Sequence, residues 1–294
     1  MIRCIATILL STALAIAARA QAVPFVTIQP SAERLAAGGA HVATPDNYNL
    51  TESLLEVNVG KTLWQTRAIN FNLTNLGARF KVTPDLTASL TVTSNSMAEI
   101  TLYGDSGQVL GTAMPNELCA GIYVAYNPIR PLIINLTGKY IRSALTDTEE
   151  ASSLAADIGV IWRFGKWTHY PFAVGIRVEN LGKGIDYGYG SYPLPTTVRI
   201  GGYDLAPLAE GHALEIAADL GTMPAFETFL TSISAGYIFK KMIAVRGGAH
   251  ISTKADIMPT YASVGIGFTS TIFDISAAYL TAFNTYSISA RLKL

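Results

Sequence analysis

Hydrophobic residues occupy every second position in nine stretches of the C-terminal half of this chain. The first stretch places Leu154, Ile158 and Trp162 on one side of an extended strand and small or polar residues on the other. Successive side chains of a β-strand point to opposite faces, so the pattern predicts strands with an apolar environment on one side and water on the other. Such alternation over many strands is typical of the wall of a transmembrane β-barrel.

The composition agrees with a membrane setting. Half of the residues are hydrophobic and 14% are charged, against about 25% charged in typical soluble domains. After the first 20 residues, however, polar residues and glycines interrupt every run before the ~18 apolar residues that a membrane-spanning helix needs. The 21 basic and 21 acidic residues balance, and no basic cluster exceeds Lys240-Lys241. Nucleic acid is therefore not an expected partner.

The N-terminus has the pattern of a secretory signal peptide. Arg3 precedes an apolar run over residues 5–17, and Ala18-Arg19-Ala20 forms a small-x-small cleavage site before Gln21. We expect residues 1–20 to be removed and the mature chain to reach the bacterial outer membrane, with outer-membrane lipid as its surroundings. Cys119 is then the only cysteine, which leaves no partner for an intramolecular disulfide.

The mature chain divides into an N-terminal plug at residues 21–61 and a barrel at residues 62–294. Residues 31–37 resemble one or two helical turns, and Gly38-Gly39 follows them. We expect Arg34, Gly38 and Gly39 to contact the inner barrel wall, because glycine permits close backbone approach. The alternative is an ordinary flexible turn.

The barrel is predicted to be an all-β, antiparallel, up-and-down transmembrane barrel of about fourteen strands. Among the first candidate strands, one apolar set is Ile69, Phe71 and Leu73, and the next is Leu76, Ala78, Phe80 and Val82; each set is expected to face lipid. A hairpin is expected at residues 100–111. The longer connections expected on the extracellular side are residues 143–153, 182–195, 204–211, 221–228 and 252–260.

Charged residues on the opposite strand faces predict a polar network inside the barrel. Its members are Arg177, Glu179, Arg199, Glu215, Asp219, Arg246, Asp274 and Arg291. Two interpretations are open: the charges neutralise one another in the lumen, which we favour, or they line a solute pathway. Their mixed signs give no preference for anions or cations.

Three tyrosines, Tyr187, Tyr189 and Tyr192, stand among glycines and prolines in the second of the long connections. They fit an aromatic girdle at the membrane surface, the interpretation we favour, or a surface that contacts a protein partner.

Catalytic chemistry is not indicated. The four histidines, His41, His169, His212 and His250, stand far apart and in no metal-ligand spacing. No phosphate-binding loop or Cys-x-x-Cys motif is present. We therefore expect a non-enzymatic protein without metal or cofactor.

Several short motifs resemble the PorV/PorQ family of outer-membrane proteins. They begin with Arg34-Leu35, Gly38-Gly39-Ala40 and Val42-Ala43, and continue at residues 156–160, 174–182, 194–201, 246–248, 265–267 and 274–279. The family usually carries an Asn-Pro-Ala-like element after the opening glycines, and Asn47-Tyr48-Asn49 departs from it. The chain is also short for the family.

This resemblance implies a fourteen-stranded barrel similar to long-chain fatty-acid transporters, with an accessory role in type IX secretion in Bacteroidota-like bacteria. PorV-like members pass secreted cargo to the attachment complex, and PorQ-like members hold other components of that complex. The leading hypothesis is thus a docking protein for secretion-system proteins or secreted cargo, through the loops at residues 182–195 and 221–228. The alternative is a fatty-acid-transporter-like barrel that admits hydrophobic small molecules past its plug.

Overall fold

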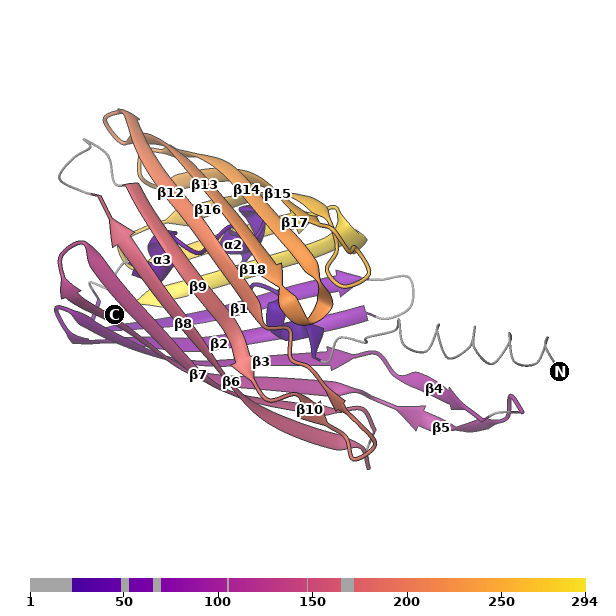
Figure 1. The fold of residues 1–294 in the computed structure, drawn as a ribbon. Coiled ribbons are helices and arrows are strands. Elements are labelled where there is room, and N and C mark those ends of the chain that lie inside the picture. Colours follow the sequence, from indigo (N-terminus) through magenta and orange to yellow (C-terminus); the bar gives the residue numbers. More distant parts are fainter. Residues whose placement is uncertain (1–22, 49–52, 66–69, 105, 147, 165–171) are drawn as a thin grey trace, which may run out of the picture.

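Fourteen strands of the chain close into one antiparallel barrel (Figure 1). The computed structural model describes residues 23–48, 53–65, 70–104, 106–146, 148–164 and 172–294, so the predicted signal peptide lies outside the described residues. The all-β class and the strand number expected from the sequence are confirmed. The barrel strands are β1 (Leu55–Gln65), β2 (Asn70–Thr83), β3 (Leu86–Met97), β6 (Asn116–Ile129), β7 (Leu132–Ala144), β8 (Glu150–Arg163), β9 (Phe172–Gly182), β12 (Thr197–Ala209), β13 (His212–Met223), β14 (Thr228–Phe239), β15 (Ile243–Ser252), β16 (Tyr261–Thr269), β17 (Phe273–Leu280) and β18 (Thr285–Lys293).

The two ends of the barrel differ in their connections. Two- or three-residue turns join most strands at one end, the turn end, where β1 begins and the C-terminus lies. The opposite end, the loop end, carries two further hairpins, β4 (Ile100–Tyr103) with β5 (Val109–Ala113) and β10 (Ile185–Asp186) with β11 (Ser191–Tyr192). Short turns of such barrels are periplasmic and long loops extracellular, which assigns the loop end to the cell exterior.

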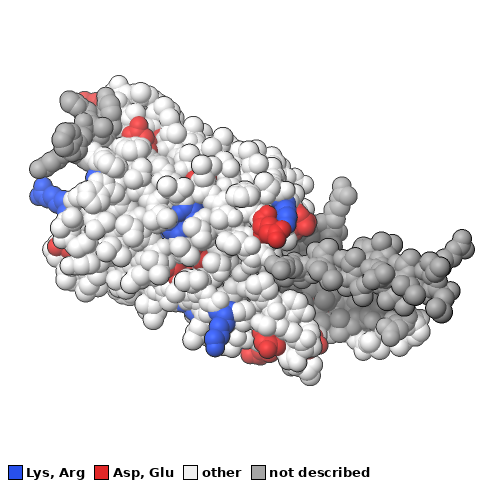
Figure 2. All heavy atoms as spheres, in the orientation of Figure 1, with Lys and Arg blue, Asp and Glu red and all other residues white. Residues whose placement is uncertain are grey.

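The outer surface is an apolar band. On three neighbouring strands Ile176, Ile200 and Leu220 are paired across the sheet, and each is at least half exposed. Arg177, which follows Ile176 on β9, and Arg199, which precedes Ile200 on β12, point inward and are buried. Figure 2 shows an outer surface that is mostly uncharged. This exterior suits hydrocarbon, and the protein has the fold of an outer-membrane barrel. Among the described residues, no helix is long and apolar enough to cross a membrane.

Three boundaries or orientations differ from expectation. Leu73 points into the lumen and is 4% exposed, because apolar plug residues such as Phe25 fill the loop end of the barrel. Strand β1 begins at Leu55 rather than after residue 61; an outward Lys61, bonded to Thr74, interrupts its apolar pattern. Residues 204–211 form no extracellular loop, because β12 continues to Ala209 through a register shift next to Pro207 and turns at the turn end.

A plug occupies the lumen before β1 begins. It consists of η1 (Pro24–Thr27), α2 (Ala32–Ala36) and α3 (Pro45–Tyr48). The α2 turn starts because the Ser31 hydroxyl accepts a hydrogen bond from the backbone N–H of Arg34, an N-cap that precedes a short run rich in alanine. Its apolar side, with Leu35, packs on Tyr261 and Leu280 of the inner wall. Figure 1 shows α2 and α3 enclosed by the strands.

Candidate functional site: the plugged lumen

The plug backbone comes close to the backbone of the inner wall at Gly38. Gly38 has φ of +61°, and a Cβ there would lie 2.6 Å from the backbone nitrogen of Ala249. On the wall, a Cβ on Gly248 would lie 2.5 Å from the carbonyl carbon of Ala37. The Gly38 N–H donates to the Ser263 hydroxyl at 3.0 Å. Two glycines, one on each side, therefore allow this contact. Gly39, with φ of +74°, lies next to the hydroxyl of Tyr261.

A second attachment point is built on Asp219, one of the lumen residues identified from the sequence. Its carboxylate accepts hydrogen bonds from the backbone N–H groups of His41, at 2.7 Å, and Val42, at 3.1 Å. The His41 ring lies 3.1 Å from Glu179 through Nε2, and its side chain is 1% exposed. The wall thus fixes the plug by accepting hydrogen bonds from the plug backbone and from a buried histidine. Sequence inspection missed His41 because nothing in its neighbourhood marks it as a lumen residue.

A third attachment point centres on Asp46 of α3. Its carboxylate lies 3.4 Å from Arg34 of α2 and 3.4 Å from Arg291 of β18, and its backbone carbonyl accepts from Arg79 of β2. Burial opposes ionisation of Asp46, but the guanidinium groups of Arg291, Arg34 and Arg79 outweigh it and hold the pKa of this carboxyl well below its usual value. Asp46 therefore stays anionic and ties two plug helices to two wall strands.

The eight lumen residues named from the sequence all lie on the inner wall, but they form separate groups. Arg177 pairs with Asp157 at 3.2 Å and with Glu179 at 2.9 Å. Arg199 lies 4.0 Å from Glu179.

On the strands that follow β12, Arg246 of β15 binds Glu215 of β13 and, at 2.9 Å, Glu33 of the plug. Asp274 pairs with Lys293 at 2.7 Å and with Arg291 at 3.7 Å. The plug thus takes part in the polar groups that the strand pattern alone assigned to the wall.

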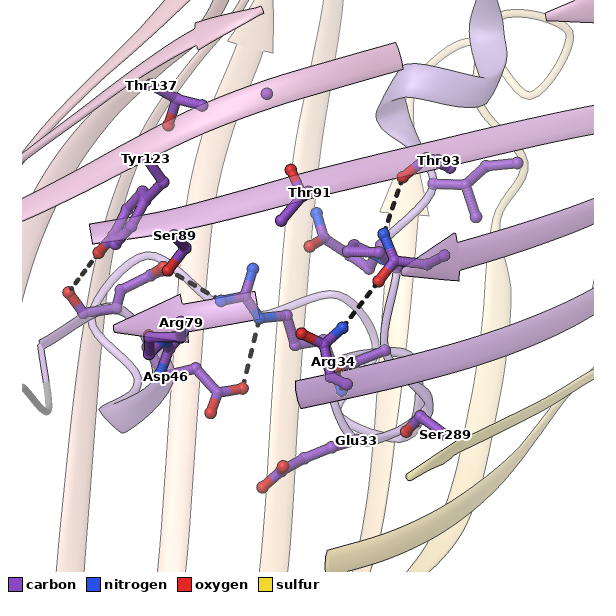
Figure 3. Close-up of a pocket in the computed structure, with 18 of the residues that line it drawn as sticks. Glu33, Arg34, Asp46, Arg79, Ser89, Thr91, Thr93, Tyr123, Thr137 and Ser289 are labelled. Atoms are coloured by element: carbon purple, nitrogen blue, oxygen red, sulfur yellow. Dashed lines mark hydrogen bonds and ion pairs between the residues drawn. The ribbon is translucent and has the colours of Figure 1, made fainter. Parts of the chain in front are cut away.

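The described residues of the barrel and plug enclose two lumen cavities that bear on function. The first, cavity A, has a volume of about 250 Å³ and extends from Phe25 near the loop end to Asp46. The second, cavity B, has a volume of about 230 Å³ and reaches Ile238 at the turn end of β14. Glu33, Arg34 and Asp46 line both. The Arg34–Asp46 pair therefore borders both spaces. Figure 3 shows the two residues among those that line cavity A.

The three tyrosines belong to the β10–β11 hairpin and its turn rather than to the outer barrel wall. Their ring centroids lie 6.1 to 6.5 Å apart, and the Tyr187 hydroxyl donates to Ser143 at 2.8 Å. Tyr187 and Tyr192 pack on the apolar cluster that contains Phe25, whereas Tyr189 is 61% exposed. Burial raises the pKa of Tyr187. Two of the rings therefore help to close the loop end, and one remains on the surface.

Other chemistry is sparse in the described part of the chain. Within it, no group of three or more His, Cys, Asp or Glu residues is placed to hold a metal ion. The described histidines have separate surroundings: His212 bonds Tyr237 at the turn end, and His250 bonds Ser232 in the lumen. His169 lies outside the described residues.

Comparison with known proteins supports the fold at low sequence identity. No protein-family model matches the chain, and no curated protein matches its sequence. Among solved structures, the CymD monoaromatic hydrocarbon channel aligns over 91% of this chain and 98% of its own, with a TM-score of 0.63 and 12% identity. The toluene transporter TbuX of Ralstonia pickettii aligns over 90% and 98%, with a TM-score of 0.58 and 11% identity. The toluene transporter TodX of P. putida aligns over 90% and 98%, with a TM-score of 0.57 and 9% identity.

These likenesses are to non-enzymatic transport barrels, and identities of 9–12% show the shared architecture alone. They do not show membership of the PorV/PorQ family, which stays a prediction from the sequence motifs.

Proposed function

We propose that this protein is a plugged outer-membrane channel that admits small molecules with substantial apolar surface. The observation that carries the proposal is the pair of lumen cavities with plug residues Glu33, Arg34 and Asp46 lining both. A purely structural barrel has no need for a lumen that is hollow on both sides of a plug.

The contacts of the plug are of a kind that can be released. Many of the attachments are hydrogen bonds, ion pairs and glycine contacts, and α2 buries only three apolar residues, Ala32, Leu35 and Ala36. Each such polar contact contributes on the order of 1 kcal/mol net. The barrel wall, in contrast, is closed by hydrogen bonds between all fourteen strands. Movement of the plug is therefore far cheaper than opening of the wall.

The three transport proteins with this architecture support the proposal by analogy. Their names describe monoaromatic hydrocarbon or toluene passage, and all three share the barrel over nearly their whole length. The apolar cluster at the loop end of this lumen, with Phe25, Leu73 and Ile141, is the place where a hydrophobic molecule from outside would first enter.

The test is uptake of toluene by intact bacteria whose outer membrane contains the full chain or a variant lacking residues 23–43, compared with the same bacteria without the protein. We expect faster uptake in the variant, because it lacks α2 and the backbone groups that Asp219 binds. Resistance of the barrel to unfolding in SDS verifies that the variant is folded. Equal uptake by two folded barrels would contradict a channel function. Asp256→Asn, an exposed change in a loop at the loop end, is the matched control for handling.

The docking function in type IX secretion is the second candidate, and one observation favours it. Val109, Leu110 and Met114 are each more than 60% exposed on or beside the β4–β5 hairpin, which projects beyond the barrel in Figure 1. Exposed apolar residues of this kind suit a protein contact.

Deletion of residues 184–192, or Val109→Ser with Leu110→Ser, is expected to reduce co-purification with secretion components or signal-bearing cargo. Unchanged co-purification in both variants would remove these loops as docking surfaces.

A further inference from the structure

One wall of cavity A carries a row of hydroxyl groups. Ser89, Thr91 and Thr93 follow one another at every second position of β3, and Thr137 lies on β7 beyond the intervening strand (Figure 3). In the described part of the chain, the hydroxyls of Ser89, Thr91 and Thr137 make no hydrogen bond. Ser89 and Thr137 are 6% and 9% exposed, and Ser89 Oγ is fully shielded from bulk solvent.

A glycine on the neighbouring strand keeps the cavity side of this row free of a further side chain. Gly121 of β6 pairs with Thr91 in register and lines cavity A. A Cβ at Gly121 would lie 3.0 Å from the Thr91 hydroxyl and 3.6 Å from the Thr137 methyl, so the two threonines leave no space for a methyl group between them. Buried hydroxyls normally have partners, so a cavity wall with unpartnered hydroxyls is suited to a ligand that supplies donors and acceptors.

The charges around cavity A do not favour an ionic ligand. Five basic and six acidic side chains line it, and each basic one lies within 4.0 Å of an acidic one. An anion would have to compete with carboxylates already bound to every guanidinium and ammonium group. A neutral ligand encounters no such competition.

The loop end of the same cavity is apolar. Phe25, Val26 and Ile28 of the plug line it there, whereas the hydroxyl row belongs to the barrel wall. A volume of about 250 Å³ equals roughly eight water molecules at about 30 Å³ each. The cavity therefore accommodates one small molecule with a polar side and an apolar side.

We propose that cavity A binds a small neutral solute that carries two or more hydroxyl groups along one edge and an apolar face on the other side. The inference rests on the proposed channel function and narrows its solute class. It ranks hydroxylated solutes above hydrocarbons for binding in cavity A, since a hydrocarbon would leave the hydroxyls of Thr91 and Thr137 without partners.

The test compares two rings of nearly equal shape, resorcinol and m-xylene, by calorimetric titration of the full chain in lipid nanodiscs, with protein-free nanodiscs as blank. Resorcinol is expected to bind more tightly. Thr91→Val and Thr137→Val keep the side-chain shape and remove one hydroxyl each, so each is expected to weaken resorcinol binding about five-fold and leave m-xylene unchanged. Thr231→Val, on the outward face of β14, is the matched control. Gly121→Ala is expected to weaken resorcinol binding, because the added methyl group would crowd the Thr91 hydroxyl and displace it.

The outcomes separate this inference from the channel function. Tighter binding of m-xylene, or resorcinol binding that both valine variants leave intact, would overturn the hydroxylated-solute inference while the channel stands. Absence of binding for both rings would also overturn it, and the uptake comparison with the variant lacking residues 23–43 would then decide the channel function separately.

Discussion

Replacement of Gly248, a residue of the barrel wall, by alanine is expected to loosen the plug although the plug sequence stays unchanged. The added methyl group would lie 2.5 Å from the carbonyl carbon of Ala37, well inside van der Waals contact. The wall cannot retreat, because Gly248 is held in register between Ser234 of β14 and Ser263 of β16. The plug backbone must therefore move away.

The size of the effect follows from the type of conflict. Overpacking of a tight contact costs about 1–3 kcal/mol, a change of about 5- to 150-fold in the ratio of docked to released plug. Gly38→Ala should exceed it, because an alanine at φ of +61° adds about 1–2 kcal/mol of backbone strain to the clash with Ala249.

Hydrogen exchange of the backbone amides at residues 32–40, followed by mass spectrometry, measures the released fraction. Gly247→Ala is the control on the same strand, since its Cβ would meet nothing nearer than Ser263 O at 3.7 Å. Gly107→Ala is the control for Gly38→Ala: it introduces the backbone strain of a positive φ, +80°, without a clash, because nothing lies within 4 Å of the added Cβ. If Gly248→Ala exchanges no faster than Gly247→Ala, the glycine contact does not hold the plug and the argument is refuted.

Three further predictions concern the ion pairs of Asp46, the lipid-facing apolar band and the β10–β11 hairpin. The pKa of Asp46 is lower in the folded protein than its usual value of about 4, so the ion pairs of Asp46 are fully present above that pH and are lost as the pH falls through the lower folded pKa. Toluene uptake should therefore rise only below about pH 4, and Asp46→Asn should show raised uptake at every pH. Uptake that does not depend on pH in either protein would count against the ion pairs. Ile200→Arg, in the apolar band, should lower the free energy of unfolding in bilayers by about 2–4 kcal/mol. Thr112→Arg, on the exposed β4–β5 hairpin, is the control and should have little effect. Equal effects of the two changes would contradict the position of the band in the membrane. Tyr187→Phe removes the bond to Ser143 and should speed hydrogen exchange at residues 185–192 about five-fold without changing uptake; unchanged exchange would show that this bond does not order the hairpin.

The outer face of the barrel was predictable because one rule governs it everywhere. Lipid excludes charge along the whole circumference, so Ile176 and Val178 alternate with Arg177 and Glu179 as the sequence indicates. The rule fails where the lumen is not wet. Leu73 faces inward onto Phe25, and from the sequence alone an inward leucine cannot be distinguished from an outward one.

The partners of the lumen charges were beyond sequence reasoning for a different reason. Strand alternation gives the direction of a side chain but says nothing about what fills the space it enters. Arg246 meets Glu33 and Arg291 meets Asp46, and both acids belong to a plug without any periodic pattern. The position of such a segment depends on contacts more than two hundred residues away along the chain.

One sequence signal could nevertheless have traced the plug. Inward positions of a barrel strand usually carry a polar side chain, so an inward glycine marks space that something else occupies. Gly201 lies against Val42, Gly248 against Ala37 and Gly38, and Gly265 against Ala36. These glycines stand on β12, β15 and β16, the part of the wall that the plug follows. Glycines in phase with inward charges on these strands therefore indicate where the N-terminal segment is seated.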